Sequence, residues 1–175
     1  MNRAGKGTAR IDKKLTPYGQ QLLEKQRLRA YYGISEKQMR IYMKKAQKAK
    51  MTTGTAVITT LECRLDNLVY RMGLANSIRQ ARQMVSHGNI HVNGKKVDIP
   101  SFIVNVGDEI SLREKYRSNV LFKANFESAA LNEYPYLTKD QANYSAVLTR
   151  LPEREEVPIE INDALVVEFY SKSSL

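Results

Sequence analysis

The sequence is poor in the residues that form disulfides and zinc sites. Its 175 residues include one cysteine, two histidines and no tryptophan. A single cysteine excludes an intramolecular disulfide, and Cys63, His87 and His91 together are too few ligands for a structural zinc site. The glycine at position 88 is expected to end a helix between the two histidines, so they cannot share a helix face. We therefore expect neither a metal nor a cofactor.

Long apolar runs and catalytic motifs are missing as well. No segment approaches the roughly 18 consecutive apolar residues of a membrane-spanning helix, and the start of the chain lacks the apolar stretch of a secretory signal. The segment from Gly5 to Thr8 has neither the spacing nor the preceding strand of a P-loop. These absences argue against a membrane protein, an enzyme and a small-molecule substrate.

Charge is abundant but unevenly distributed. The chain has 28 Lys and Arg residues against 18 Asp and Glu residues, for a net charge of +10. Residues 1–60 contain 14 of the basic residues and only three acids, whereas residues 116–175 contain six basic residues and nine acids. A basic front half predicts a polyanionic partner, and a merely solvated basic surface is the alternative.

The patterns divide the chain into four parts and predict an α+β fold. These parts are a basic arm at residues 1–14, a helical domain at 15–60, an RNA-binding module of two helices and a small antiparallel β-sheet at 61–115, and a C-terminal segment at 116–175. The arm has no apolar period and is expected to be disordered until it meets nucleic acid. The C-terminal helix and strands are expected to complete the sheet and to pack on the helical domain.

Capping signals place two helices in the helical domain. Thr16 and Pro17 suit the start of the first helix, and Gly33 suits its end. Ser35 and the glutamine three residues later form a capping box for a second helix that runs to about Lys50. A row of cations on the second helix is expected to face phosphate, with a solvated face as the alternative.

The next segment has the clearest helical spacing of apolar residues in the chain. After it, apolar residues recur at every second position, as in strands. Apolar residues from Ile58 to Met72 form one stripe, which predicts a single third helix with Cys63 as inert packing. A fourth helix is expected between Ser77 and Gly88. Short strands are expected at residues 90–92, around 97, at 102–106 and at 110–112, with a hairpin turn at 93–94.

The C-terminal segment gives weaker signals. It predicts a helix over residues 117–131, strands over 134–137 and 145–149, and a last strand over 165–170 that is rich in Val, Phe and Tyr. Glu153, Glu155 and Glu156 lie on a short loop between two prolines, which makes that loop stiff and anionic. We expect it to face solvent or a basic protein neighbour.

Cations mark the module as a candidate RNA interface. Arg79 and Arg82 are three residues apart and share one helix face, and guanidinium forks on a rigid shelf suit phosphates across an RNA groove. For Arg82, an ion pair with Asp66 is the alternative. The candidate RNA-binding residues are Lys13, Lys14, Arg27, Arg29, Arg40, Lys44, Lys45, Arg64, Arg71, Arg79, Arg82, Ser86, His87, Asn89, His91, Lys95 and Lys96.

Several of these residues lie in segments that resemble a known family. Residues 64–73 (RLDNLVYRMG) and 81–101 (ARQMVSHGNIHVNGKKVDIPS) are similar to the RNA-binding module named after small-subunit ribosomal protein S-four. Residues 18–29 with 32–33, 149–154 and 160–171 resemble the flanks of the ribosomal protein itself, in its bacterial or organellar form. Two positions depart from the pattern, because Ile78 replaces the usual Arg and Asn89 a frequent His. The chain also begins without the extra N-terminal segment that many bacterial members have.

The resemblance implies a structural constituent of the small ribosomal subunit. Such a protein is a primary rRNA binder that nucleates assembly of the subunit body and contributes to translational accuracy. The expected partners are the rRNA and ribosomal protein five of the small subunit, which is the basic neighbour implied for the three glutamates. The expected location is the cytoplasmic ribosome or an organellar one. A free-standing translational regulator is the alternative, and an enzyme that has lost its catalytic domain is a remote third.

Overall fold

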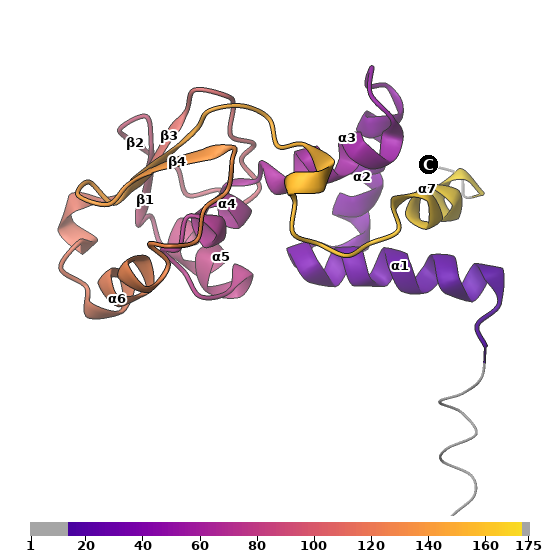
Figure 1. The fold of residues 1–175 in the computed structure, drawn as a ribbon, viewed down its shortest axis with the longest axis horizontal. Coiled ribbons are helices and arrows are strands. Elements are labelled where there is room, and N and C mark those ends of the chain that lie inside the picture. Colours follow the sequence, from indigo (N-terminus) through magenta and orange to yellow (C-terminus); the bar gives the residue numbers. More distant parts are fainter. Residues whose placement is uncertain (1–13, 173–175) are drawn as a thin grey trace, which may run out of the picture.

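The computed structural model describes residues 14–172, and these form two lobes joined side by side (Figure 1). The basic arm, apart from Lys14, lies outside the described residues. The helical lobe contains α1 (Pro17–Tyr32), α2 (Glu36–Gln47), α3 (Thr53–Glu62) and α7 (Asp163–Ser171). The sheet lobe contains α4 (Leu65–Arg71), α5 (Ile78–Ser86), α6 (Val120–Ser128) and the strands β1 (Ile90–Val92), β2 (Lys95–Lys96), β3 (Glu109–Leu112), β4 (Leu137–Asp140) and β5 (Ser145–Leu148). This is the predicted α+β class.

The predicted caps form the first two helices. The Thr16 side chain accepts a hydrogen bond of 3.0 Å from the backbone N–H of Gly19 at the start of α1. Gly33 ends this helix in the left-handed conformation, at φ 64°, and a β-carbon there would lie 3.2 Å from an Arg82 nitrogen. Ser35 makes the predicted capping box at the start of α2, which ends at Gln47, short of the expected position.

The prediction of one long third helix is wrong. The chain breaks at Arg64, whose backbone is extended at φ −64° and ψ 142°, so that α3 and α4 are separate helices. The break is stabilised from outside, because the Leu65 N–H donates to the Phe102 carbonyl at 2.8 Å. The apolar stripe divides at the same point. Ile58 belongs to the core of the helical lobe, whereas Leu65 and Met72 belong to the core of the sheet lobe.

The five strands form one antiparallel sheet in the order β2-β1-β3-β5-β4. The hairpin of β1 and β2 turns at residues 93–94, as predicted. Residues 102–106, expected as a strand, make only an isolated bridge between Ile103 and Arg64. A strand was expected over residues 134–137, but β4 begins only at Leu137 and continues to Asp140. The helix expected over 117–131 is the shorter α6.

The prediction of a last strand over residues 165–170 is also wrong, because this segment is the helix α7. Asn162 caps it, accepting a 3.4 Å hydrogen bond from the Leu165 N–H. Val166 and Tyr170, four residues apart, are both buried, so the helical spacing of the apolar residues outweighed their β propensity. After β5 the chain crosses back to the helical lobe, where α7 packs on α1 and α3 (Figure 1).

Candidate RNA-binding surface

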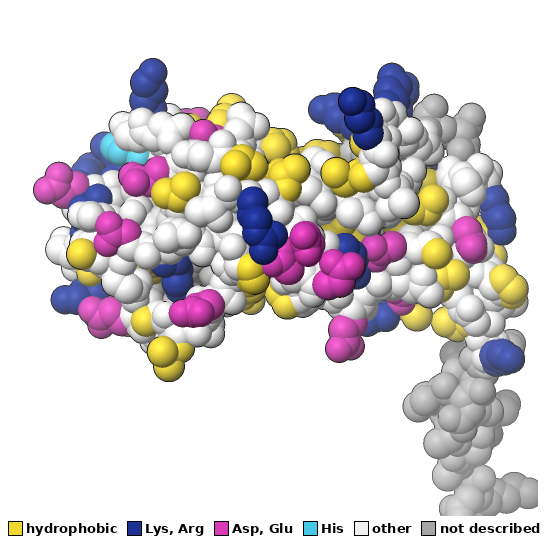
Figure 2. Space-filling model, turned by 45° about the horizontal axis from the view of Figure 1, so that its top comes forward, with side chains coloured by type: hydrophobic (Ala, Val, Ile, Leu, Met, Phe, Trp, Pro, Cys, Tyr) yellow, Lys and Arg dark blue, Asp and Glu magenta, His cyan; other side chains and the backbone are white. Residues whose placement is uncertain are grey.

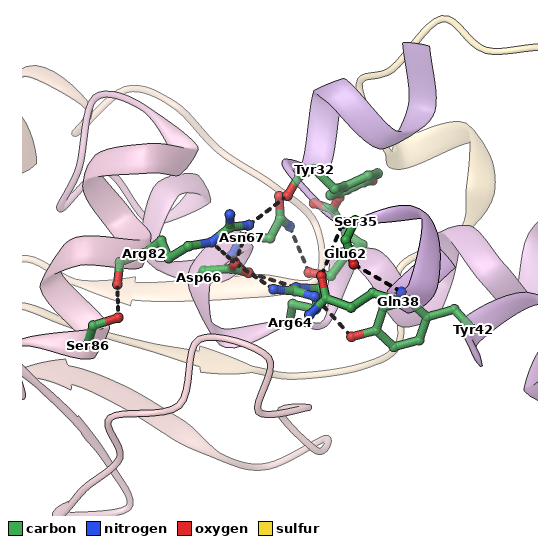
Figure 3. Close-up of polar contacts among 10 residues, drawn as sticks. All are labelled: Tyr32, Ser35, Gln38, Tyr42, Glu62, Arg64, Asp66, Asn67, Arg82 and Ser86. Carbon is green, nitrogen blue, oxygen red and sulfur yellow. Dashed lines mark hydrogen bonds and ion pairs between the residues drawn. The ribbon is translucent and has the colours of Figure 1, made fainter. Parts of the chain in front are cut away.

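The two lobes meet around buried arginines and carboxylates. Arg64 is 2% exposed, and its Nε and Nη2 donate to the Asp66 carboxylate at 3.1 and 2.9 Å. Its third donor, Nη1, reaches the Tyr42 hydroxyl on α2 at 3.0 Å. Figure 3 shows this contact linking the two lobes. These donors are thus occupied inside the protein, whereas an RNA contact was expected for Arg64.

A second buried cluster surrounds Glu62, which is fully inaccessible at the end of α3. Its carboxylate accepts hydrogen bonds from Arg71 Nε at 2.7 Å, from the Tyr32 hydroxyl at 2.8 Å and from the Tyr136 hydroxyl at 2.7 Å. Burial and the neighbouring Glu62 charge raise the pKa of both tyrosines, so each remains a proton donor. Arg71, for which an RNA contact was also expected, is 4% exposed and lies inside the protein.

Arg82 occupies an intermediate position at the edge of the lobe junction. Its Nε and Nη2 contact Asp66 Oδ2 at 3.3 and 3.2 Å, and Nη2 also donates to the Tyr32 carbonyl at 3.2 Å (Figure 3). The ion pair that was the alternative for Arg82 is therefore present. However, 37% of its side chain remains exposed, so one guanidinium can hold the lobes and still reach a ligand.

The exposed side of α5 continues away from this junction. Arg79, Ser86 and His87 are exposed, and Arg79 has no ion pair within the described residues. Ser86 donates its hydroxyl to the Arg82 carbonyl at 2.9 Å. Asn89 is different, because it is buried and its carbonyl accepts the Arg113 N–H at 2.9 Å. Asn89 thus joins α5 to the sheet rather than projecting to solvent.

The sheet edge beside α5 carries a second group of cations. In the β1–β2 hairpin His91 lies opposite Lys96, and Lys95 and Lys96 are exposed. His91 also pairs with Ser111 on β3. Because every second residue of a strand points to the same face of the sheet, Arg113 is expected on the same face as Ser111. Sequence reasoning missed three cations here, namely Arg113, Lys115 and Arg117. The alternation of side chains along the strand, from Ser111 to Arg113, could have identified Arg113.

The charges around His91 define the electrostatics of this edge. Partial burial lowers the pKa of His91, and the nearby Arg113 and Arg117 lower it further. The Arg113 side chain is held by a 3.0 Å hydrogen bond from Nη1 to the Gly88 carbonyl, and Arg117 Nε donates to the Leu112 carbonyl at 3.2 Å. These fixed cations create a positive field in which His91 favours its neutral form and an anion would be stabilised.

The helical lobe presents another cationic region at its top. Figure 2 shows Lys and Arg side chains gathered over the end of α2 and the link to α3. Lys44 and Lys45 are exposed there and have no ion pair within the described residues, and Lys14 is exposed just before α1. The predicted arginines are more engaged, because Arg27 pairs with Glu24 at 2.7 Å and both Arg29 and Arg40 pair with Glu36 at 3.5 and 3.4 Å.

The three glutamates of the C-terminal loop are not equivalent. Residues Arg154–Glu156 form a 3₁₀ turn, η3, in which Glu156 accepts hydrogen bonds from Arg150 and from the Glu153 N–H. The Glu153 side chain caps the same turn. Glu155 is exposed and has no partner within the described residues, so it alone is fully available to a neighbour. On the face of the molecule shown in Figure 2, acidic side chains gather near the middle.

Between residues 14 and 172 no group of three His, Cys, Asp or Glu residues is arranged to hold a metal. The helices in that range are too short or too polar to cross a membrane. Cys63 is buried, and burial together with Glu62 raises the pKa of its thiol to about 12. The thiol therefore stays protonated, in agreement with a packing role.

Together, the helical lobe and the helix-helix-sheet lobe edged with cations form the architecture expected of an RNA-binding protein. The family model described as "S4 domain" matches residues 63–110, and "Ribosomal protein S4/S9 N-terminal domain" matches residues 2–62. The boundary between the two models coincides with the break between α3 and α4. The chain belongs to the uS4 family of small ribosomal subunit proteins.

Relatives support this assignment over nearly the whole chain. Small ribosomal subunit protein uS4 of Finegoldia magna is 62% identical over 97% of this chain and 86% of its own length. Protein uS4B of Clostridium acetobutylicum is 51% identical over 91% and 83%, and uS4 of Acetivibrio thermocellus is 50% identical over 91% and 77%. The predicted family is thereby confirmed, and its members are structural proteins rather than enzymes.

Proposed function

We propose that this chain is a structural constituent of the small ribosomal subunit and binds its rRNA through cations of both lobes. One observation carries the proposal: exposed, unpaired cations lie on both lobes of one locked frame. Arg79, Lys95 and Lys96 are on the sheet lobe, and Lys44 and Lys45 are on the helical lobe. Such an arrangement suits phosphates of several RNA helices at fixed spacing, as at a helix junction.

We propose two roles for the predicted RNA-binding residues, according to their exposure. Exposed cations, with His87, His91 and the partly exposed Arg82, are proposed to contact RNA. Arg113 and Arg117 are added to them because of their place beside His91, and Lys115 is added because it is an exposed cation between these two arginines in the chain. Arg64, Arg71 and Asn89 are proposed to position the two lobes and the sheet without touching RNA.

The finer role follows from the locked lobes. A protein that holds several RNA helices at a fixed geometry reduces the conformational freedom of the free RNA, so we propose that it binds early and nucleates assembly of the subunit body. We also propose a contribution to translational accuracy through contact with ribosomal protein five of the small subunit, for which Glu155 is the available acidic residue. The bacterial relatives support a cytoplasmic ribosome as its location.

Co-sedimentation tests the proposal against a free-standing translational regulator. Tagged protein is expressed in cells, and the lysate is centrifuged through a gradient at high salt. A core ribosomal protein stays with the small subunit because its contacts are buried in the assembled particle. If the protein instead remains at the top of the gradient in high salt but not in low salt, the regulator becomes the better account.

A further inference from the structure

A small cavity lies in the sheet lobe, close to the first turn of α5. It has a volume of about 280 Å³ and is formed where the end of α4, the link to α5 and the end of α6 come together. Gly73 allows this close approach, because a β-carbon at this position would lie 2.3 Å from the Ala129 β-carbon. The ends of α4 and α6 are therefore in direct contact at one edge of the cavity.

Two tyrosines from separate segments line the cavity. Tyr70 comes from α4, and Tyr134 precedes β4. The Arg71 guanidinium lies 5.7 Å from the Tyr70 ring centre and 5.5 Å from the Tyr134 ring centre, so one buried cation holds both rings. Neither tyrosine hydroxyl has a hydrogen-bond partner among the described residues. The rings are thus half-buried aromatic surfaces whose orientation is already set.

Amide side chains occupy the remaining wall. Asn125 donates through Nδ2 to the Leu74 carbonyl and to Gln80 Oε1, both at 3.3 Å, which fixes its orientation. The side chains of Asn76 and Asn132 are exposed and have no hydrogen-bond partner within residues 14–172. Each side-chain amide offers two donors and an acceptor, which is the pattern needed to pair with the edge of a nucleobase.

The charge of the cavity indicates a neutral ligand. Its only charged lining residue among those described is Arg71, and the Glu62 carboxylate already balances that charge at 2.7 Å. A phosphate would find no available cation inside. The first turn of α5 begins beside Asn76, however, and carries the exposed Arg79, so a phosphate can be neutralised immediately outside the cavity.

We propose that this cavity binds one unpaired nucleobase of the bound RNA, stacked on Tyr134 and Tyr70, with its edge facing the asparagine amides. The inference rests on the proposed function, because it names a contact within the same RNA complex. Sequence-specific RNA recognition commonly uses bases that are turned out of a helix and stacked on aromatic rings. The surrounding cations would bind the RNA according to the shape of its backbone. The cavity would then determine which nucleotide lies at this position on the protein.

The test measures binding of a small-subunit rRNA fragment to four forms of the protein. Tyr134→Leu removes the stacking surface, Tyr134→Phe keeps it, and Asn132→Ala removes one amide that has no role in the fold. Tyr134→Leu should weaken binding by roughly 5- to 150-fold, which corresponds to about 1–3 kcal/mol at 1.4 kcal/mol per factor of ten. Tyr134→Phe should bind within about twofold of the parent, and Asn132→Ala should lose several-fold.

The salt dependence separates stacking from loss of charge contacts. Because stacking releases no counterions, Tyr134→Leu should keep the parent slope of log affinity against log salt. If the parent does not bind the fragment, the proposed function fails with this inference. If the parent binds and both Tyr134→Leu and Asn132→Ala bind equally well, only the nucleobase site is overturned. Thermal unfolding of Tyr134→Leu is measured in parallel, and Asn132→Ala decides the matter if that variant is unstable.

Discussion

Glu62 and Tyr136 are 74 positions apart in the chain, yet the Tyr136 hydroxyl donates a 2.7 Å hydrogen bond to the Glu62 carboxylate. Tyr32, from the end of α1, donates to the same carboxylate at 2.8 Å. One buried anion therefore joins α1, the end of α3 and the segment leading into β4. This shared contact fixes the orientation of the lobes and hence the spacing between their exposed cations.

Removing the Glu62 carboxylate should strongly destabilise the protein. Glu62→Ala leaves Arg71 buried without its partner, and breaking such a pair costs about 3–5 kcal/mol. Tyr136→Phe removes one of several hydrogen bonds to the same group and should cost about 1–2 kcal/mol. Urea denaturation measures both free energies of unfolding. Tyr18→Phe is the control, because Tyr18 is exposed and this substitution should leave the free energy of unfolding nearly unchanged. If Glu62→Ala lowers the free energy of unfolding by less than about 1 kcal/mol, the proposed role of this cluster is contradicted.

Arg79 and Arg82 should respond differently to removal, although they share one helix. Arg79→Ala should weaken rRNA binding by about 1–3 kcal/mol, lower the salt slope by about one and leave stability unchanged. Arg82→Ala should lower stability by about 1–2 kcal/mol, because its hydrogen bonds to Asp66 and to the Tyr32 carbonyl are lost while Arg64 still neutralises Asp66.

Urea denaturation and a filter-binding assay on both variants check this assignment. Equal loss of RNA affinity in the two variants, with no loss of stability in either, would show that Arg82 acts only as a surface cation.

RNA affinity should depend on the protonation of His91. In the free protein its pKa lies below the ordinary value near 6.5, because of partial burial and then Arg113 and Arg117. The unfolded chain thus binds this proton more readily, and the His91 contribution to stability falls as pH drops below about 6.5. RNA phosphates at this edge offset the arginine charges and favour protonated His91, so affinity should rise as pH falls from about 7.5 to 6.

His91→Asn should remove that part of the pH dependence of affinity. The measurement compares dissociation constants of parent and variant across this pH range at constant ionic strength. Parallel curves for the two proteins would place RNA away from the β1–β2 edge.

The acidic loop should contribute to a protein contact rather than to RNA binding. Glu155→Lys reverses the exposed charge without disturbing the Arg150–Glu156 pair, so rRNA affinity should be unchanged or slightly higher. Loosening a contact with ribosomal protein five should raise stop-codon readthrough in a reporter strain. Glu127→Lys, an exposed acid on α6, is the matched control. Unchanged readthrough with the Glu155→Lys protein present in subunits would mean that this loop is solvated surface.

Local signals predicted the elements that local chemistry determines. Thr16, Gly33, Ser35 and Ser77 gave the right helix ends, because caps act within a few residues of themselves. The two errors in helix assignment have a tertiary origin. The break at Arg64 is made by backbone bonds from residues 100–104, and the helicity of α7 depends on its packing against α1 and α3.

The residues of the candidate site also differ in how far the sequence alone could identify their role. Surface cations such as Arg79 and Lys95 could be identified from charge and helix face alone. Arg64 and Arg71 could not be recognised as internal, because their burial depends on contacts that distant segments make. Arg64 donates to Tyr42 on α2, and Glu62, the nearby partner of Arg71, also accepts from the distant Tyr136 hydroxyl. In the sequence, an arginine that pairs with a buried carboxylate looks the same as an exposed arginine that contacts phosphate.

The most direct test of the account is a salt titration of the parent protein on a small-subunit rRNA fragment. If the cations of both lobes together neutralise about six to ten phosphates, affinity should fall by roughly 10³- to 10⁵-fold between about 50 and 200 mM salt. Removing Lys44 and Lys45 on one lobe, or Lys95 and Lys96 on the other, should each make that dependence shallower by about two in slope. A parent affinity that changes little over this salt range would contradict the central claim.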